Sequence, residues 1–220
     1  MSVSGLFLVL FLLFHMSMNL AAVFSTEAYN AICEFLGANW YALAGTLILA
    51  AGVVVHLVYA TVLTLHNRSS RGRQRYAMTA EPEGVTWASR NMYVLGIIIV
   101  LGLLLHLYNF WYNMQFAEII GNHELGPFPP ADGAAYIAAL FSSPVYCIIY
   151  LVWFAAIWFH LTHGFWSAFH TIGWDNQTWL PRLKRIANVV ATIVFLCFAL
   201  VVIVFYLRSL GVCGGSCAGF

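Results

Sequence analysis

The stretch LVWFAAIWFHLTHGFWSAFH, residues 151–170, decides the fold and also raises the question of function. Almost every residue in it is apolar, yet it contains His160, His163 and His170. An apolar run of this length is typical of a helix that crosses a membrane. An imidazole inside a membrane is costly unless it has a partner, so histidines at this depth indicate a functional site.

The composition of the whole chain points to a membrane protein. Hydrophobic residues make up 62% of the 220 residues and charged residues 8%, whereas soluble domains carry roughly 25% charged residues. A soluble protein of this length could not bury so much apolar surface. We therefore expect an all-α, multi-pass membrane protein in which residues 1–220 form one domain. No basic patch exists outside two short loops, so we expect no nucleic acid among its partners.

Five apolar runs are long enough to span a bilayer, and we place them at about residues 3–24, 40–66, 91–120, 138–170 and 186–207. We interpret the first as a retained span, because no Lys or Arg precedes it and its apolar character continues to Phe24. Eight of the nine Lys and Arg residues lie in the second and fourth connections. Basic loops stay in the cytoplasm, so we predict the N-terminus inside and the C-terminus outside.

Four histidines lie deep in four different spans, and their depths fall into two layers. With a rise of about 1.5 Å per residue, His15 and His106 lie about 18 and 24 Å from the inner ends of their spans, which puts both in the outer half. His56 and His160 lie about 24 Å from the outer ends of theirs, in the inner half. Two stacked haem groups in a helix bundle require such layers, because each iron takes one histidine from each of two helices. We therefore predict that four of the five helices form a dihaem bundle. The alternative for each histidine is a buried imidazole bonded to a carbonyl or hydroxyl of another helix.

Other polar residues near these layers are candidate contacts of a haem propionate or of the haem pocket: Ser2, Ser4, His66, His163 and His170. A surface imidazole at a helix end is the alternative for His66 and His170, and helix-start capping is the alternative for the two serines. His163 is one turn from His160 on nearly the same face, so depth alone does not choose between them as a ligand.

These residues resemble a known family, the cytochrome b subunit of succinate:quinone oxidoreductases, in its five-span, two-haem group. The opening Ser4-Gly-Leu-Phe-Leu, followed by His15, is similar to the first span of that family. His160-x-x-x-Gly164-Phe-Trp-Ser resembles its fourth-span motif, in which the histidine four residues before the glycine is the ligand. That similarity favours His160 over His163. The resemblance covers almost the whole chain, including the alternation of loops.

The resemblance implies a membrane anchor that binds two haem b groups. His56 and His160 would ligate the proximal haem near the cytoplasm, and His15 and His106 the distal haem near the outer face. The partners would be a flavoprotein subunit with FAD and an iron–sulfur subunit, both on the cytoplasmic side of the bacterial inner membrane. The anchor would exchange electrons with a quinone, and the dicarboxylate site would lie on another subunit.

Two-haem members of this family typically use menaquinone, so we expect quinol:fumarate reduction, a step of anaerobic respiration. Succinate oxidation by the same architecture stays open, as does dimerisation of the complex. The family places a quinol site near the distal haem, where Glu27, Glu34 or Glu118 could accept a proton. Ordinary solvation at the membrane interface is the alternative for these carboxylates.

Three other classes of protein compete with this interpretation. One is a dihaem cytochrome b that serves a hydrogenase or a formate dehydrogenase. The second is a haem-free transporter whose histidines relay protons, although such proteins more often show intramembrane carboxylates or broken helices. The third is a purely structural anchor, which would have no reason to match histidine depths. The pair Cys213 and Cys217 in the tail leaves a disulfide and two free thiols both open.

Overall fold

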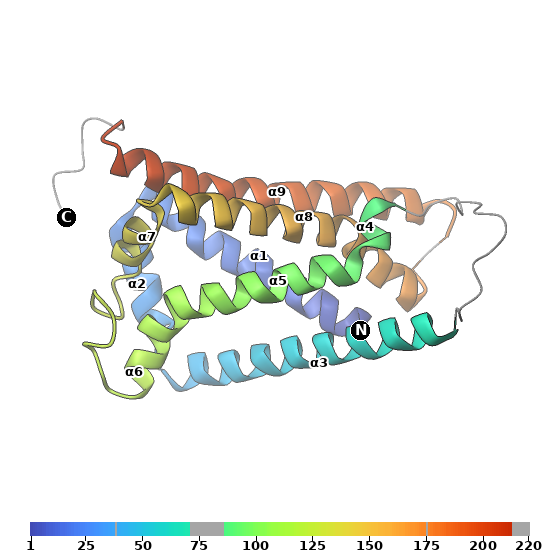
Figure 1. Cartoon of the computed structure of the whole chain (residues 1–220), viewed down its shortest axis with the longest axis horizontal. Helices are drawn as coiled ribbons and strands as arrows, with labels where there is room; N and C mark the ends of the chain where they lie inside the picture. The colour runs from blue at the N-terminus through green and yellow to red at the C-terminus, as the bar shows by residue number, and fades with distance from the viewer. Residues whose placement is uncertain (38, 71–85, 175, 213–220) are drawn as a thin grey trace.

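The computed structural model describes residues 1–37, 39–70, 86–174 and 176–212, and every regular element in these ranges is helical. Five helical stretches are long and apolar enough to cross a membrane, as the sequence predicted. They are α1 (Ser2–Phe24), α3 (Trp40–Ser70), Met92–Ile119, α8 (Pro144–Ile172) and α9 (Trp179–Ser209). Figure 1 shows them running side by side, with the last turns of α9 at the end where the short helices α2, α6 and α7 gather.

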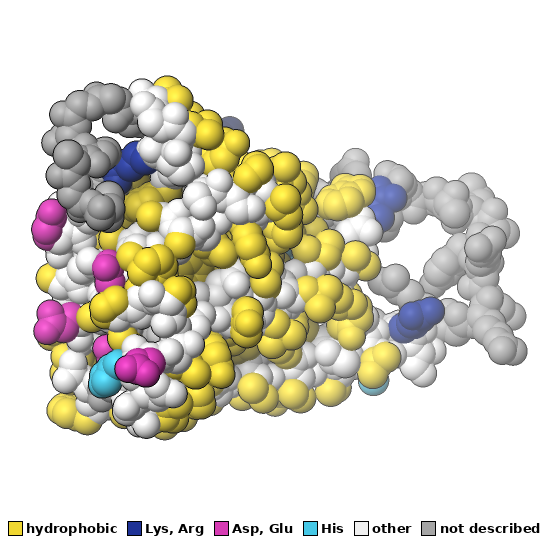
Figure 2. Space-filling view, turned by 60° about the vertical axis from the view of Figure 1, so that its left-hand side comes forward, with side chains coloured by type: hydrophobic (Ala, Val, Ile, Leu, Met, Phe, Trp, Pro, Cys, Tyr) yellow, Lys and Arg dark blue, Asp and Glu magenta, His cyan; other side chains and the backbone are white. Residues whose placement is uncertain are grey.

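Charged side chains lie at the two ends of the bundle, and apolar side chains cover the surface between them (Figure 2). The end that we call the acidic end carries Glu27, Glu34, Glu118, Glu124 and Asp132. The opposite end, which we call the basic end, carries Arg68, Arg90, Arg182, Lys184 and Arg185. This distribution is that of a multi-pass membrane protein. That the basic end faces the cytoplasm stays a prediction, and Arg71, Arg73 and Arg75 lie outside the described residues.

The most closely packed part of the bundle is formed by α1, α8 and α9. Its buried residues include small ones, among them Ala22 on α1 and Ala191 and Ala199 on α9. Small residues let helix backbones approach one another, which is the main source of packing energy between helices in a membrane. In contrast, no residue of α3 is buried, so α3 lies at the edge of the bundle along α1 and α5.

Two short helices at the acidic end were not predicted. The helix α2 (Thr26–Phe35) begins where the Ser25 hydroxyl accepts a hydrogen bond from the Ala28 N–H, at 3.1 Å. The helix α7 (Gly133–Phe141) begins in the same way at Asp132. Side-chain capping satisfies backbone N–H groups that have no partner within the helix. The Asn30 side chain joins the two helices, because its amide group donates to Asp132 Oδ1 at 2.8 Å.

The predicted start of the fourth span at residue 138 was wrong. The helix α7 ends at Phe141, and α8 begins only at Pro144. Proline has no N–H and disfavours a helical conformation in the residue before it, and Ser143 is extended at φ −89° and ψ 121°. The predicted start of the fifth span at residue 186 was also late. The helix α9 begins at Trp179, and Pro181 lies in its first turn, where proline is tolerated.

The third span is not a uniform α-helix. It consists of α5 (Met92–His106), a π-helix η1 (Leu107–Phe116) and α6 (Ala117–Ile119), and the short helix α4 (Trp87–Arg90) precedes it. The sequence predicted a single apolar span at about residues 91–120. Most π-helices are single-turn insertions that occur at functional sites. The π-helix begins directly after His106, one of the predicted ligands.

Candidate functional site

His15 and His106 face each other across two helices, in what we call the acidic-end pair. His15 lies on α1 and His106 is the last residue of α5. Their ring centroids are 5.7 Å apart, and the ring planes are nearly perpendicular, at 88°. The sequence predicted this pairing from depth alone, and the structure brings the two rings together.

His56 and His160 form the second pair, which we call the basic-end pair. His56 lies on α3 and His160 on α8. Their ring centroids are 6.4 Å apart and their planes make an angle of 69°. The ring of His163 instead contacts Trp166, at 5.0 Å, so of these two histidines on α8 it is His160 that lies opposite His56.

The two pairs are stacked along the bundle. The Ser4 hydroxyl lies 3.4 Å from Nδ1 of His56, and the ring of His56 also approaches Gly5. Ser4 precedes His15 by eleven residues on the same helix. At about 1.5 Å per residue, the two pairs are therefore roughly 16 Å apart along α1.

In each pair, the ring of one histidine contacts a polar side chain. The other histidine has a buried Nδ1 atom without a hydrogen-bond partner among the described residues. Asn19 Nδ2 lies 3.3 Å from Nε2 of His15, and the Tyr29 hydroxyl donates to Asn19 Oδ1 at 3.1 Å. Ser4 takes the corresponding place beside His56. Within the described residues, Nδ1 of His106 and Nδ1 of His160 have no hydrogen-bond partner, and the same is true of Nδ1 of His163 outside the pairs. An unpartnered buried polar atom costs about 1–3 kcal/mol, so each calls for a physical explanation.

Both pairs fit a metal held between two imidazoles. Two metal–nitrogen bonds of about 2 Å, together with about 1.2 Å from each ring nitrogen to its ring centre, would separate the centroids by about 6.4 Å in a straight arrangement. The basic-end pair has this separation, 6.4 Å, and the rings of the acidic-end pair are closer together, at 5.7 Å. Within the described residues there is no group of three or more His, Cys, Asp or Glu that could hold a metal ion. The donor sets are therefore paired imidazoles, which suit haem iron better than a bare ion that needs three or four protein ligands.

Aromatic side chains surround the acidic-end pair. Phe110 and Trp153 lie 5.1 and 5.6 Å from the His106 ring, centroid to centroid, and Tyr150 lies 6.3 Å away. On the other side, Phe11 stacks on His15 at 5.4 Å. These surroundings are apolar and consist of aromatic rings, which suits a planar aromatic ligand better than a hydrated ion.

The other predicted pocket residues gather at the basic end, at different distances from the histidine pairs. Ser4 contacts His56, whereas the half-buried Ser2 makes no side-chain hydrogen bond to any described residue. Trp166 lies between His163 and His170, and the Lys184 ammonium group lies 4.7 Å from the Trp166 ring centroid. His66 is exposed on the last turns of α3.

The three predicted proton acceptors differ in their surroundings. Glu27 is exposed, and its own backbone N–H and the Ser25 hydroxyl lower the pKa of its carboxyl group. Glu34 is exposed on the next turns of α2. Glu118 is half-buried, and its carboxylate packs against Gly37 so closely that a β-carbon there would collide with it. Of the three carboxylates, that of Glu118 is the most enclosed by protein.

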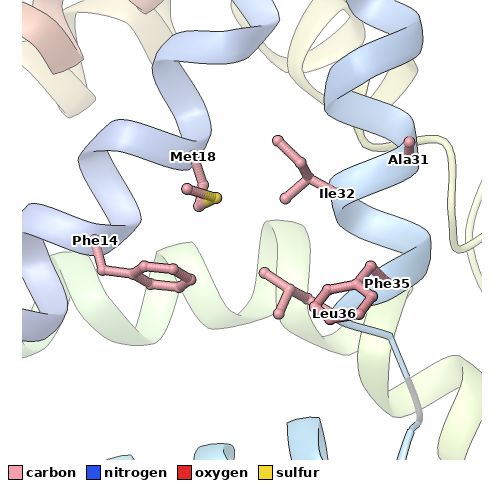
Figure 3. A pocket seen from close by; sticks show the side chains of 6 residues that line it. All are labelled: Phe14, Met18, Ala31, Ile32, Phe35 and Leu36. Atoms are coloured by element: carbon pink, nitrogen blue, oxygen red, sulfur yellow. The ribbon is translucent and has the colours of Figure 1, made fainter.

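An apolar pocket of about 280 Å³ lies between α1 and α2, at the acidic end. Figure 3 shows Phe14 and Met18 of α1 facing Ile32 of α2 and Leu36, the residue after α2, and Ala31 and Phe35 complete the lining. Phe14 directly precedes His15, and Met18 is three residues beyond it. An apolar ligand in this pocket would therefore lie at about the depth of the acidic-end pair, against a neighbouring face of α1.

Sequence reasoning missed the residues that orient the paired histidines. Asn19 had a detectable signal, because residues four apart lie on the same face of a helix and Asn19 follows His15 at that spacing. Trp153 and Tyr29 had no such signal, since Trp153 contacts His106, and Tyr29 contacts Asn19, from another helix. A scan of protein-family models, a search of curated proteins and a search of solved structures each gave no match to this chain.

Proposed function

We propose that this chain is a dihaem cytochrome b, the membrane anchor of a quinol:fumarate reductase. One observation supports this most directly. Two pairs of histidines from different helices lie at two depths, with ring separations suited to a metal between them. A haem-free anchor has no reason to bring its deep histidines together in this way. A proton relay would favour histidines that are linked by hydrogen bonds. Nδ1 of His106 and Nδ1 of His160 instead have no hydrogen-bond partner among the described residues.

In this proposal, haem supplies one-electron transfer when it is bound, and the chain supplies ligands, orientation and an apolar surrounding. His15 and His106 hold the distal haem, and His56 and His160 hold the proximal haem. Asn19 and Ser4 orient one histidine of each pair from its own or a neighbouring helix. With a separation of roughly 16 Å along α1, the two haem sites would lie in sequence between the two ends of the bundle.

The direction of electron flow in this proposal runs from the acidic end to the basic end. Menaquinol would bind in the apolar pocket lined by Phe14, Met18 and α2, at about the depth of His15. Glu118, the enclosed carboxylate at that end, would accept a proton from the quinol. Electrons would leave at the basic end to an iron–sulfur subunit and an FAD-containing flavoprotein on the cytoplasmic side of a bacterial inner membrane. The same anchor would serve a succinate dehydrogenase that runs in reverse.

The deciding experiment is a pyridine haemochrome assay on the purified complex of this chain with its partners. We expect two b haems per copy of the chain. The variants His15→Ala and His56→Ala should each retain one haem, and His163→Ala, a histidine of similar depth outside the pairs, should retain both. Turnover with menaquinol and fumarate would then test the assigned reaction.

Two outcomes would contradict the proposal in different ways. A complex without haem would exclude every cytochrome reading and favour a proton relay or a packing role for the four histidines. Two haems without turnover of fumarate or succinate would keep the dihaem site but point to an anchor of another respiratory complex.

A further inference from the structure

We infer that Trp153 is a positioning residue, which sits in a slot left by Gly102 and holds the His106 ring perpendicular to that of His15. This rests on the proposed function, since the orientation matters only if both rings bind one iron. Neither residue ligates the metal. The inference concerns the geometry of the ligand pair and therefore the electronic state of the iron.

The slot exists because residue 102 has no side chain. A β-carbon on Gly102 would collide with the indole of Trp153, at both its Cδ1 and its Nε1. The indole therefore lies directly against the backbone of α5, one turn before His106. It is fixed there by a hydrogen bond from Nε1 to the Ile99 carbonyl oxygen, at 3.0 Å.

From this slot the indole reaches the ligand ring. The centroids of Trp153 and His106 are 5.6 Å apart, with 33° between the ring planes. Tyr150 also contacts the indole, edge to face at 5.7 Å. A shift of the indole would therefore remove one of the aromatic contacts of the His106 ring.

His106 depends on this packing because it lacks the usual support. A metal-bound histidine normally donates its second ring N–H to a carboxylate, carbonyl or water, and that bond fixes the ring. Nδ1 of His106 is buried and has no hydrogen-bond partner among the described residues. In His15, by contrast, Nε2 lies 3.3 Å from Nδ2 of Asn19, an amide nitrogen that donates a hydrogen bond to the ring. In the acidic-end pair, one ring is therefore held by a polar contact and the other by aromatic packing.

Ring orientation has a direct spectroscopic consequence. In a ferric low-spin haem, perpendicular imidazole planes make the two highest filled or half-filled d orbitals almost equal in energy, and the first EPR feature then moves to high g. Rotation of one ring towards the plane of the other separates these orbitals and lowers that g value. The angle of 88° between His15 and His106 predicts a high-g signal for this pair.

The test is EPR of the oxidised complex, with two variants and two matched controls. Gly102→Ala displaces the indole, and Trp153→Phe keeps an aromatic ring but removes the bond to Ile99. Gly96→Ala is the control on α5, because a β-carbon there has nothing within 4 Å. Trp158→Phe is the control on α8, because its indole donates to Thr192 at 3.1 Å, on the α9 side. The signal that His15→Ala removes identifies the acidic-end haem.

We expect both haems to remain in all four proteins. The g value of the acidic-end signal should fall in Gly102→Ala, in Trp153→Phe or in both, with the basic-end signal and both controls unchanged. Unaltered g values in both variants, with two haems bound, would overturn the positioning role and leave the proposed function intact. An equal shift in the controls would also overturn it. Absence of haem from the unmodified complex would overturn the inference and the proposed function together.

Discussion

The four paired histidines differ in whether their ring nitrogens have hydrogen-bond partners. His106 and His160 each bury a ring nitrogen without a hydrogen-bond partner among the described residues, while His15 and His56 each have one polar neighbour. Nδ1 of His163 is also buried without a partner in the described part of the chain, so this feature does not distinguish the paired histidines, and the facing of their rings is the observation that supports a shared ligand. The role that we propose for these four histidines is to bind haem iron in pairs.

Glu118 provides a prediction about quinol oxidation. We expect Glu118→Gln to lower menaquinol oxidation by at least tenfold, because general acid–base catalysis by one residue contributes typically about 10²–10⁴-fold. Haem content should not change, since Glu118 packs against Gly37 and not against a histidine pair. Glu34→Gln, which alters an exposed carboxylate on α2, is the matched control. Full activity in Glu118→Gln would remove this residue from the proposed proton path.

At the level of elements, α3 is the helix most sensitive to local changes. It has no buried residue, yet it supplies His56. Thr46 near its start donates to Gln115 on η1 at 2.8 Å, and Ser4 reaches its middle. Gly52 lets α1 approach, since a β-carbon at this position would lie 2.7 Å from the Phe7 ring. The position of the basic-end pair therefore depends on a few contacts along one edge helix.

Gly52→Val should selectively impair the basic-end haem. The added side chain would push α3 away from α1 and move His56 from its place opposite His160. Overpacking of this kind typically costs about 1–3 kcal/mol. We expect the haem content to fall from two to about one, with the acidic-end signal retained in optical and EPR spectra. Gly45→Val on the same helix has open space and serves as the control. Loss of both haems, or of neither, would contradict this account of α3.

Arg208 is a basic residue at the acidic end, and its contacts explain its position. Its Nη2 donates to the Val23 carbonyl oxygen at 2.8 Å, and its guanidinium group lies 5.1 Å from the Phe205 ring centroid. The last carbonyl groups of a helix lack partners within it, and a positive charge there is favourable. Arg208 thus joins the end of α9 to the end of α1.

We expect Arg208→Gln to lower the free energy of unfolding in detergent by about 1–2 kcal/mol, the range for a hydrogen bond to a charged group in a partly exposed site. Arg182→Gln is the control, because Arg182 is exposed and contacts only the ring of Trp179 among the described residues. Equal stability of the two variants, measured by denaturant titration, would show that the contact with Val23 contributes nothing.

On the scale of the whole molecule, bound haem should hold the bundle together. Each pair of ligands joins two helices, α1 with α5 and α3 with α8, and one haem in each would cross-link them. A ligand that binds only the folded state stabilises it by RT ln(1 + [L]/Kd), which is about 4 kcal/mol at a thousandfold excess over Kd.

Protein produced under haem limitation should therefore unfold at a lower temperature than the haem-loaded protein. The measurement is a thermal melt in detergent, with haem content determined on the same samples. The edge helix α3 should be the first to gain hydrogen exchange in the haem-poor protein, because it has no buried residue. Identical melts and exchange at low and full haem content would exclude a cross-linking role for haem.

The membrane location, the five spans and the two histidine layers all follow from the amino-acid sequence without any knowledge of the fold. Each of these depends on one helix at a time, because apolar length and the rise per residue need no information about neighbours. The same reasoning failed at residues 138–144, where α7 and α8 are separate helices, and at residues 107–116, where the helix is of the π type. Both failures concern local backbone hydrogen bonding, which the apolar pattern does not encode.

Only the tertiary structure decided which side chains meet. It placed His160 and not His163 opposite His56, brought Glu118 against Gly37, and seated Trp153 on Gly102 beside His106. These contacts depend on how far each helix is rotated about its axis and on how closely two backbones approach. In a membrane, small residues and a few polar contacts fix both quantities. Those residues act in pairs from different helices, and for that reason a single span could not reveal them.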